Sequence, residues 1–492
     1  MGSIFHATHR ALDGFIPNDE VGGVPAFVGD APASTGETVA TIAFRVNECD
    51  EPLALHGLSL LVQHLVLGHL DSGVAGVEPH ADAHTLGITI RGDRSAVASQ
   101  LQRVGTALRT PDLDRLSDVA SALRTAAARR ALTVLGQSGY FRFGPTGYGI
   151  ADLREFALEQ PDGELVTSWI QRYFTRDNAV IWVSDPLDGP IDLGLSAGSR
   201  HAAPPARPLP EPMPTWTAGP DDAISLTVVA DWRIEFEVAW HALRLDVEAG
   251  LARWPSRISA AVSPIEGGLT AHAELTLRAN GRCTTEIRDH LMALVTRFCW
   301  DGPSDAVLAA VKAEFATRFD GPDAELDEIG HRAAAWLVGT DAPPFDVLRD
   351  RTDALDLAGA AELVERSLDT AVWFVPTDLP IADRRYHRIP AWSRELLDGT
   401  PVDTLPGVSP ARRLIAAHHG LTMLTAPDRG ITTRFAEIEA MVIFPSGARQ
   451  IIGSDGFTMT VQPDQWPDGS GIIRWIDQQV SDDRKVFLSA TR

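Results

Sequence analysis

A dense run of prolines divides this chain near its middle. Residues 201–214 read HAAPPARPLPEPMP. Because proline fixes φ and lacks a backbone N–H, this run can form neither a helix interior nor a central strand, and we interpret it as an extended linker. A second group of prolines lies between Pro376 and Pro410. At 492 residues the chain is also too long for one ordinary core. We therefore predict domains at 1–200, 221–378 and 409–492, joined by linkers at 201–220 and 379–408.

The first two domains are predicted to contain strands and helices in the same order. Residues 38–46 are rich in β-branched side chains and residues 55–67 are nearly all apolar, which indicates a strand followed by a buried helix. Residues 224–230 and 232–252 repeat this succession. The common order indicates a duplication, although direct identity between the two segments is poor. The predicted fold class is α+β, with two tandem α/β sandwich domains.

The C-terminal domain has a different pattern. Short β-rich runs alternate with glycine-containing turns between residues 420 and 461, and an amphipathic segment at 471–480 carries Trp475. Several antiparallel strands closed by a final helix are typical of a small pleckstrin-homology-like barrel. This is an analogy of fold and predicts no function.

The charge of the chain argues against two classes of partner. Its 66 acidic and 43 basic residues give a formal net charge of -23, which repels nucleic acid phosphates and anionic lipids. The sequence reveals no local basic patch to offset this charge, so we predict neither a nucleic acid nor a membrane partner. The acidity suits a soluble protein, or one that receives basic peptides.

Three observations predict a cytoplasmic protein. The cysteines, Cys49, Cys283 and Cys299, are widely spaced and form no paired motif, as expected in a reducing compartment. Residues 1–6 do not have the pattern of a signal peptide. No run of about eighteen apolar residues occurs, so no membrane-spanning helix is predicted.

Three short motifs follow one another along the chain. They are FRVNECDEP at 44–52 with HGLSLLVQHL at 56–65, FGPTGYG at 143–149, and YFTRDNAV at 173–180. This succession resembles that of the pitrilysin/insulinase-type (inverzincin) metallopeptidases, in which a strand precedes a helix that carries H-x-x-E-H. The resemblance implies a clamshell of two duplicated halves, and it points to the non-catalytic subunits that are like mitochondrial processing peptidase.

The residues that this family uses for catalysis are replaced here. The family binds zinc through two histidines one helical turn apart and a later glutamate, and a second glutamate is the general base. The resemblance places Leu60 and His64 at the histidines, Gln63 at the base and Ala126 at the later glutamate. Leucine has no lone pair for zinc, and glutamine cannot accept a proton from water near neutral pH. We therefore predict no zinc, no other cofactor and no catalytic residue, with His64 the residual metal-site residue.

The resemblance also provides candidates for peptide binding. The family's second half carries an arginine and a tyrosine seven residues apart; Arg253 fits the arginine, but Ala260 stands at the tyrosine. An extended peptide can add to a sheet edge without any metal, and residues 84–91 are the predicted edge strand. Arg253 either holds a peptide carbonyl or C-terminus, or only solvates the end of a helix. The predicted peptide-binding residues are His84, Thr85, Leu86 and Arg253.

Three functions are compatible with these features. The expected one is a non-catalytic pseudopeptidase subunit that binds peptide, or pairs with an active metallopeptidase homologue or a second copy of itself to form a proteolytic chamber. The first alternative is a free-standing scaffold or peptide-binding protein. The second is an active metallopeptidase with a non-standard metal site. The candidate ligands for that site are His64, His80 and His84, although a loop with scattered histidines is the favoured interpretation of them.

Overall fold

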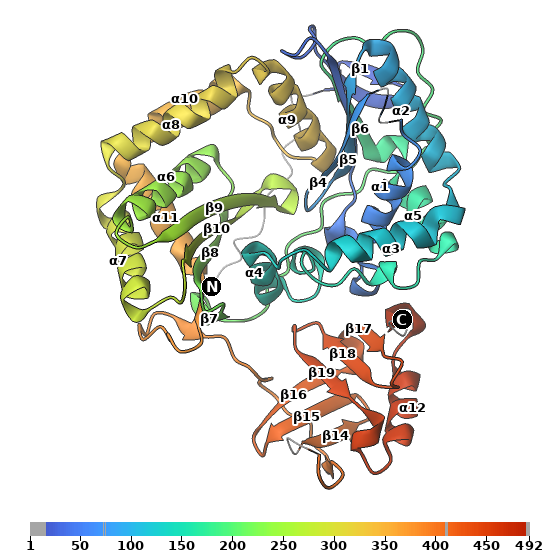
Figure 1. Ribbon diagram of the computed structural model, residues 1–492, viewed down its shortest axis with the longest axis vertical. Helices are drawn as coiled ribbons and strands as arrows, with labels where there is room; N and C mark the ends of the chain where they lie inside the picture. Colours follow the sequence, from blue (N-terminus) through green and yellow to red (C-terminus); the bar gives the residue numbers. More distant parts are fainter. Residues whose placement is uncertain (1–15, 72, 74, 409–411, 489–492) are drawn as a thin grey trace.

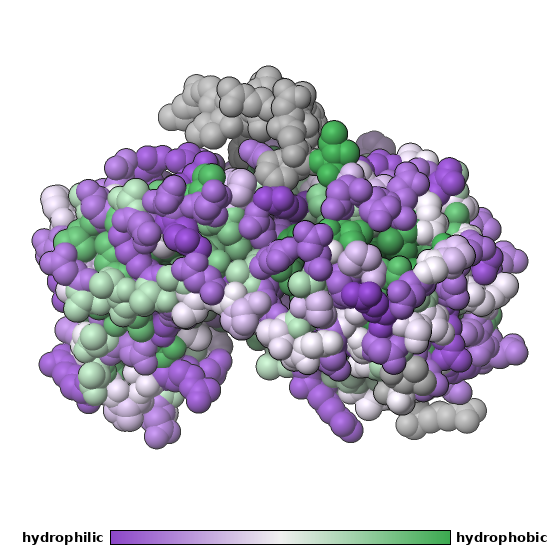
Figure 2. Space-filling model, turned by 90° about the horizontal axis from the view of Figure 1, so that it is seen from above, coloured by the Kyte–Doolittle hydropathy of each residue, from purple (hydrophilic) through white to green (hydrophobic). Residues whose placement is uncertain are grey.

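The computed structural model describes residues 16–71, 73, 75–408 and 412–488. These residues form two lobes, each a sheet covered by helices, and a smaller C-terminal domain that contacts the first lobe (Figure 1). Seen from above, the molecule presents a mainly hydrophilic surface with small hydrophobic areas (Figure 2). Within the described ranges, no helix has the length and apolar character needed to cross a bilayer. The prediction about the first six residues concerns a segment outside these ranges.

The first lobe is built on a six-stranded sheet in the order β1-β2-β6-β3-β5-β4. Every residue of β3, near the centre, is buried, because its small and β-branched side chains pack on both faces. β6 pairs antiparallel with β3 and parallel with β2. The strands are β1 (Asp19–Val21), β2 (Val24–Val28), β3 (Thr38–Phe44), β4 (Gly76–Ala81), β5 (Leu86–Gly92) and β6 (Ala179–Val183).

Four helices of this lobe share one hydrophobic core with the strands, namely α1, α2, α3 and α5. The fifth, α4, lies outside that core. Gly136 and Gly139 lower the helix propensity of α4, so its sequence does not predict it. The helices are α1 (Leu58–Leu67), α2 (Arg94–Arg109), α3 (Leu116–Ala127), α4 (Val134–Phe143) and α5 (Gly163–Tyr173).

The second lobe repeats the topology of the first. Its sheet has the order β12-β7-β11-β8-β10-β9, so β7, β11, β8, β10 and β9 correspond to β2, β6, β3, β5 and β4. The directions agree as well, because β11 is parallel to β7 and antiparallel to β8. The predicted common order of elements is confirmed. The strands are β7 (Thr215–Gly219), β8 (Ala223–Asp231), β9 (Ser256–Ile265), β10 (Thr270–Ala279), β11 (Val372–Pro376) and β12 (His387–Arg388).

Each half of the chain also provides one helix to the sheet of the other. α9 packs Ala333 and Leu337 against Phe27 of β2 and Val180 of β6. In return, α4 of the first half lies on β8 and β10. The helices of the second half are α6 (Ile234–Gly250), α7 (Thr285–Asp301), α8 (Asp305–Asp320), α9 (Ala324–Val338), α10 (Phe345–Ala354) and α11 (Leu357–Ser367).

Two of the predicted domain boundaries differ from the structure. The linker predicted at 201–220 is too long, because its last residues form β7 of the second sheet. The linker predicted at 379–408 contains β12, which pairs with β7, and β13 (Val402–Asp403), which pairs with a strand of the C-terminal domain. Both errors have the same cause: a short strand between prolines has no periodicity long enough to detect.

The proline run at 201–214 has neither helix nor strand, as predicted, but it is fixed to the first lobe. The carbonyl oxygen of Ala202 accepts a hydrogen bond from Arg45 at 2.8 Å, and that of Pro204 accepts one from the Tyr148 hydroxyl at 2.9 Å. The run is therefore an ordered connection and not a free tether.

The C-terminal domain consists of two four-stranded sheets and α12 (Gly469–Gln479). The helix predicted to be final is followed by β20, which pairs parallel with β17. The domain packs on the first lobe where Val442 and Ile452 meet Ile150 and Phe156. Its strands are β13, β14 (Arg413–Ala417), β15 (Gly420–Ala426), β16 (Arg429–Arg434), β17 (Ile438–Ile443), β18 (Arg449–Gly453), β19 (Thr458–Val461) and β20 (Lys485–Phe487).

Candidate functional site

The predicted degenerate zinc site begins at the N-terminus of α1. Gly57 precedes the helix with a φ of 92°, and a β-carbon there would lie 2.6 Å from the β-carbon of Glu155, so the position favours glycine. The carboxylate of Glu51 accepts hydrogen bonds from the backbone N–H groups of Gly57 (2.7 Å) and Ser59 (2.6 Å). Glu51 thus satisfies N–H groups that a helix leaves unpaired at its start, and its charge favours that end of the helix.

His56 completes this cap. Its Nδ1 lies 3.1 Å from Glu51 Oε2, and both side chains are buried. Burial alone would raise the pKa of Glu51, but its hydrogen bonds with His56 and with the backbone outweigh burial and lower that pKa. Burial alone would lower the pKa of His56, but the hydrogen bond to Glu51 and the charge of Glu51 outweigh it and raise that pKa.

This pair predicts how stability depends on pH. Because the pKa of His56 is higher in the folded than in the unfolded protein, protonated His56 stabilises the fold fully below about pH 6.5, and this contribution is lost as the pH rises through the raised pKa. Because the pKa of Glu51 is lower in the folded protein, its ionised carboxylate contributes stability above about pH 4.3, and this contribution is lost as the pH falls through the lowered pKa. We expect the stability difference between the wild type and His56→Asn, measured by urea unfolding, to be larger at pH 6 than at pH 9. The same difference at both pH values would contradict this assignment.

Gln63, which the sequence resemblance places at the family's general base, has its side-chain amide hydrogen-bonded to the backbone. The side chain is 2% exposed. Its Nε2 donates to the carbonyl of His80 in β4 at 2.9 Å and to that of Gly87 in β5 at 2.7 Å. Both amide hydrogens are therefore used, and they fix α1 on the two strands. An ionised glutamate could not make these bonds, because a carboxylate only accepts.

The other positions of the degenerate site lie on α1 and α3. Leu60 is half-buried against the core of the first lobe. His64 is half-buried as well, and burial lowers its pKa, so the imidazole is neutral near pH 7. Ala126 is exposed on α3. In the part of the chain that the structure describes, no three His, Cys, Asp or Glu side chains gather closely enough to hold a metal ion.

The alternative metal site of His64, His80 and His84 is not formed. His80 is exposed on β4. His84 is buried and directs its ring to the second lobe, where its Nε2 accepts a hydrogen bond from the backbone N–H of Gly267 at 2.8 Å. The same nitrogen lies 3.1 Å from the Tyr148 hydroxyl. His80 and His84 both approach the carboxylate of Asp82, at 3.6 and 3.7 Å, but no metal-binding group of three such side chains forms around it within the described residues.

Tyr148 joins the two lobes and the proline run. Its hydroxyl donates to the carbonyl of Pro204 at 2.9 Å and accepts from the backbone N–H of Glu266 at 3.0 Å. Burial raises the pKa of Tyr148, so the hydroxyl keeps its proton at neutral pH. The sequence singled out residues 143–149 only through their resemblance to the family. In the structure, this glycine-rich segment places Tyr148 where the lobes meet.

The prediction of an edge strand at residues 84–91 is wrong. Most of these residues form β5, which lies between β3 and β4 in the sheet. Thr85 and Leu86 are buried, as His84 is, so none of the three faces a ligand in this arrangement. The edge strand on this side of the sheet is β4, which the sequence pattern misses because Glu78 and Pro79 interrupt it.

Arg253 lies far from His84. Its guanidinium carbon is 3.8 Å from the centre of the Trp254 ring, and its Nη2 is 3.5 Å from a carboxylate oxygen of Glu286. The ten residues of β9 lie between Arg253 and Glu266, and Glu266 is the neighbour of Gly267, which contacts His84. At about 3.3 Å per residue this strand spans about 30 Å. The predicted peptide-binding residues are therefore not brought together.

A second polar contact between the lobes surrounds α4. The buried guanidinium of Arg142 donates to the carbonyl oxygens of Thr227 at 2.8 Å and Thr370 at 2.7 Å, and to the Ser138 hydroxyl at 3.1 Å. That hydroxyl also lies 3.1 Å from His272 Nε2. Burial lowers the pKa of Arg142 to about 9, which leaves it charged at pH 7. Sequence reasoning missed this contact, because its partners are far apart in the chain.

Comparison with known proteins finds similarity of fold. No model of a protein family matches the sequence, and no curated protein matches it. A chain of complex III2 from Candida albicans superposes with a TM-score of 0.59 at 15% identity, over 74% of this chain and 98% of that one. The first half of the periplasmic protease PqqL from Escherichia coli gives 0.56 at 10% identity, over 75% and 93%.

A third structure is the peptidase M16 inactive domain from Pseudomonas fluorescens, with a TM-score of 0.54 at 11% identity, over 71% of this chain and 94% of that one. The chain therefore has the two-lobed metallopeptidase-like fold that the resemblance implied, and this part of the fold prediction is confirmed.

Proposed function

We propose that the chain is a non-catalytic subunit that uses the two-lobed peptidase fold to bind a peptide, a partner chain or both. The observation that carries this proposal is the environment of Gln63. Its amide donates to backbone carbonyls of β4 and β5, so the position of the general base serves to hold the fold. Leu60 and Ala126 offer no metal ligand at the two other replaced positions.

The edge strand β4 is the surface that we propose for an extended peptide. An edge strand leaves backbone N–H and C=O groups unpaired on one side, and a peptide strand can pair with them. Five of the six residues of β4 are exposed, and Val77 is half-buried. Pro79 has no N–H, so the contact would be short. This mode of binding needs no metal.

A partner chain is proposed because two of the compared structures are parts of larger units. One is a chain of complex III2, and the other is half of the protease PqqL. A chain with this fold and without the zinc ligands could complete a chamber with an active homologue or with a second copy of itself. A free-standing peptide-binding scaffold is the second candidate, and the exposed edge of β4 supports it equally.

Zinc content and mass, measured on the same sample, test this proposal. After removal of metals and reloading with zinc, we expect far less than one ion per chain, with an active homologue as the positive control. We expect light scattering to show a mass above 53.1 kDa, for the chain alone or mixed with that homologue. One tight zinc ion per chain that His64→Ala abolishes would contradict the non-catalytic assignment. A monomer under all conditions would favour the scaffold.

A further inference from the structure

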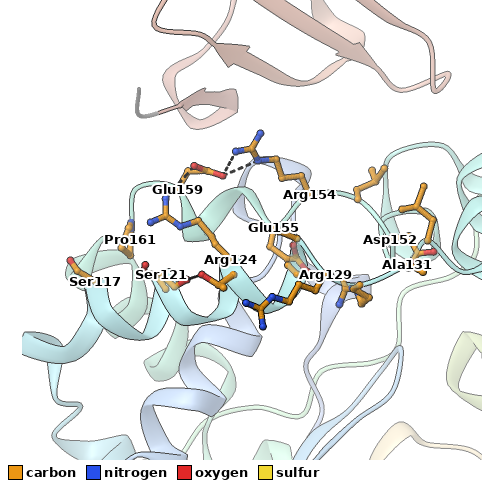
Figure 3. A pocket seen from close by; sticks show the side chains of 17 residues that line it. Ser117, Ser121, Arg124, Arg129, Ala131, Asp152, Arg154, Glu155, Glu159 and Pro161 are labelled. Carbon is orange, nitrogen blue, oxygen red and sulfur yellow. Dashed lines mark hydrogen bonds and ion pairs between the residues drawn. The ribbon is translucent and has the colours of Figure 1, made fainter. Parts of the chain in front are cut away.

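A large pocket borders α3, the helix that carries Ala126 of the predicted degenerate zinc site. It is formed by α3 and the segments at 128–132 and 152–161, and its volume is about 1290 Å³ (Figure 3). Pockets for small molecules usually measure roughly 300–1,000 Å³. This pocket therefore has room for a stretch of polypeptide.

Two buried carboxylates fix the arginines of this pocket. Glu155 accepts a hydrogen bond from Arg130 at 2.5 Å. One oxygen of Glu159 accepts from Arg154 at 2.8 Å, and the other accepts from Arg124 at 3.4 Å. Figure 3 shows the bonds between Arg154 and Glu159. The guanidinium groups are thus held in place before any ligand arrives, which reduces the entropy lost on binding.

The arginines of the pocket are more exposed than Glu155 and Glu159. The side chains of Arg124, Arg130 and Arg154 are 39%, 47% and 54% exposed. Those of the carboxylates Glu159 and Glu155 are only 7% and 8% exposed. A third carboxylate, Asp152, also lines the pocket and is half-buried, and it accepts hydrogen bonds from the backbone N–H and the hydroxyl of Thr133. A guanidinium has five N–H donors, and a carboxylate occupies only one or two of them, so each arginine keeps donors for a second anion. Arg129 also lines the pocket; it is exposed, and its side chain has no hydrogen-bond or ion-pair partner within the described residues.

The rest of the lining leaves space for a main chain. Where α3 borders the pocket, most of its residues are small, among them Ala120, Ser121 and Ala127. The positive charge is also local, because the sequence has no acidic residue between Asp118 and Asp152. The pocket lining holds four arginines and three acidic residues, the latter being Asp152, Glu155 and Glu159. The fold brings Arg154 next to the arginines of α3 and its C-terminal end.

We propose that this pocket binds an acidic motif of another polypeptide, with anionic groups supplied by Asp and Glu or by phosphorylated side chains. The planar guanidinium matches the oxygens of carboxylates and phosphates in pairs. Most of this chain, with its net charge of -23, repels such a ligand, so the pocket would also orient it. The site is separate from β4 and does not depend on the function proposed above.

Binding of two labelled peptides to the full chain tests the proposal. One peptide alternates Glu and Ala, and the other carries phosphoserine in place of Glu, so the tighter of the two identifies the anion. We expect saturable binding that weakens at high salt. Arg129→Glu should weaken it at least about tenfold, because reversal of one charge at an ionic contact costs that much or more. Arg103→Glu, the same change at an exposed position on α2 outside the pocket, should change it less than about twofold.

Three results would overturn the proposal. Neither peptide binds; both variants weaken binding equally, which indicates general charge attraction; or inorganic pyrophosphate displaces the peptides at equal concentration, which indicates a site for small anions.

Discussion

Replacing Arg142 with alanine is expected to lower the free energy of unfolding by about 3–5 kcal/mol and to uncouple the two lobes. The change removes the donors that reach the buried carbonyl of Thr227 and the partly buried carbonyl of Thr370, and it leaves a cavity beside Ser138. Each buried acceptor that is left unsatisfied costs about 1–3 kcal/mol. Because α4 carries Arg142 and packs on the second sheet, we also expect the unfolding transition of the variant to be broader than that of the wild type, or to split into two.

Urea unfolding followed by circular dichroism measures both effects. Arg142→Met keeps much of the volume but none of the donors, so its loss should be smaller than that of Arg142→Ala. Arg366→Ala is the matched control: Arg366 is exposed on α11, and its side chain pairs with Glu362 alone among the described residues, at 3.0 Å. We expect its loss to stay within about 0.5 kcal/mol. An Arg142→Ala variant as stable as this control would contradict the importance of the contact.

Elements whose pattern is local could be predicted from the sequence. Residues 38–46 contain β3, residues 55–67 contain α1, and residues 232–252 contain α6. In each case the periodicity of apolar side chains within one segment decides the structure. The same order of elements in both halves was visible for this reason, and it leads directly to the repeated sheet topology.

The order in which the strands lie side by side in each sheet could not be predicted in the same way. The sequence cannot show that β5 has a neighbour on both sides, because β4 pairs through its backbone and has no strand pattern of its own. The exchange of α4 and α9 between the sheets depends on contacts between residues far apart in the chain. Strand order and helix placement follow from such long-range contacts, which periodicity does not record.

The candidate site shows the same division. The spacing on α1 locates Leu60, Gln63 and His64 correctly on one helix, and the chemistry of the side chains predicts the loss of catalysis. It does not show that Gln63 bonds to β4 and β5. Similarly, the arginines at 124–130 are visible in the sequence, but their meeting with Arg154 is a result of the fold.

Gln63→Glu would restore the residue type of the family's general base, and we expect it to destabilise the protein by about 2–4 kcal/mol at pH 8. The new carboxylate would face the carbonyl oxygens of His80 and Gly87 without a hydrogen to donate. A carboxylate oxygen and the two carbonyl oxygens would then lie close together, with no hydrogen between them, at a buried position. The contact between α1 and the two strands would change from attraction to repulsion.

The loss should also depend on pH. Burial and the two carbonyl groups raise the pKa of the new carboxyl group above the value of about 4.3 that it has in the unfolded chain. The native variant then holds a proton that the unfolded one releases, so its stability relative to the wild type falls as pH rises from about 4.3 to the raised pKa. At pH 5 the protonated carboxyl group can donate one hydrogen bond. We therefore expect the destabilisation at pH 5 to be about half of that at pH 8.

Urea unfolding at pH 5 and pH 8 measures this difference, with Gln63→Met as the control. Methionine has a similar shape and no charge, so its loss should be the same at both pH values. If Gln63→Glu is as stable as the wild type at pH 8, the amide of Gln63 is not needed to hold α1 on β4 and β5. Position 63 would then be free to carry a base, and the observation that carries the non-catalytic proposal would be lost.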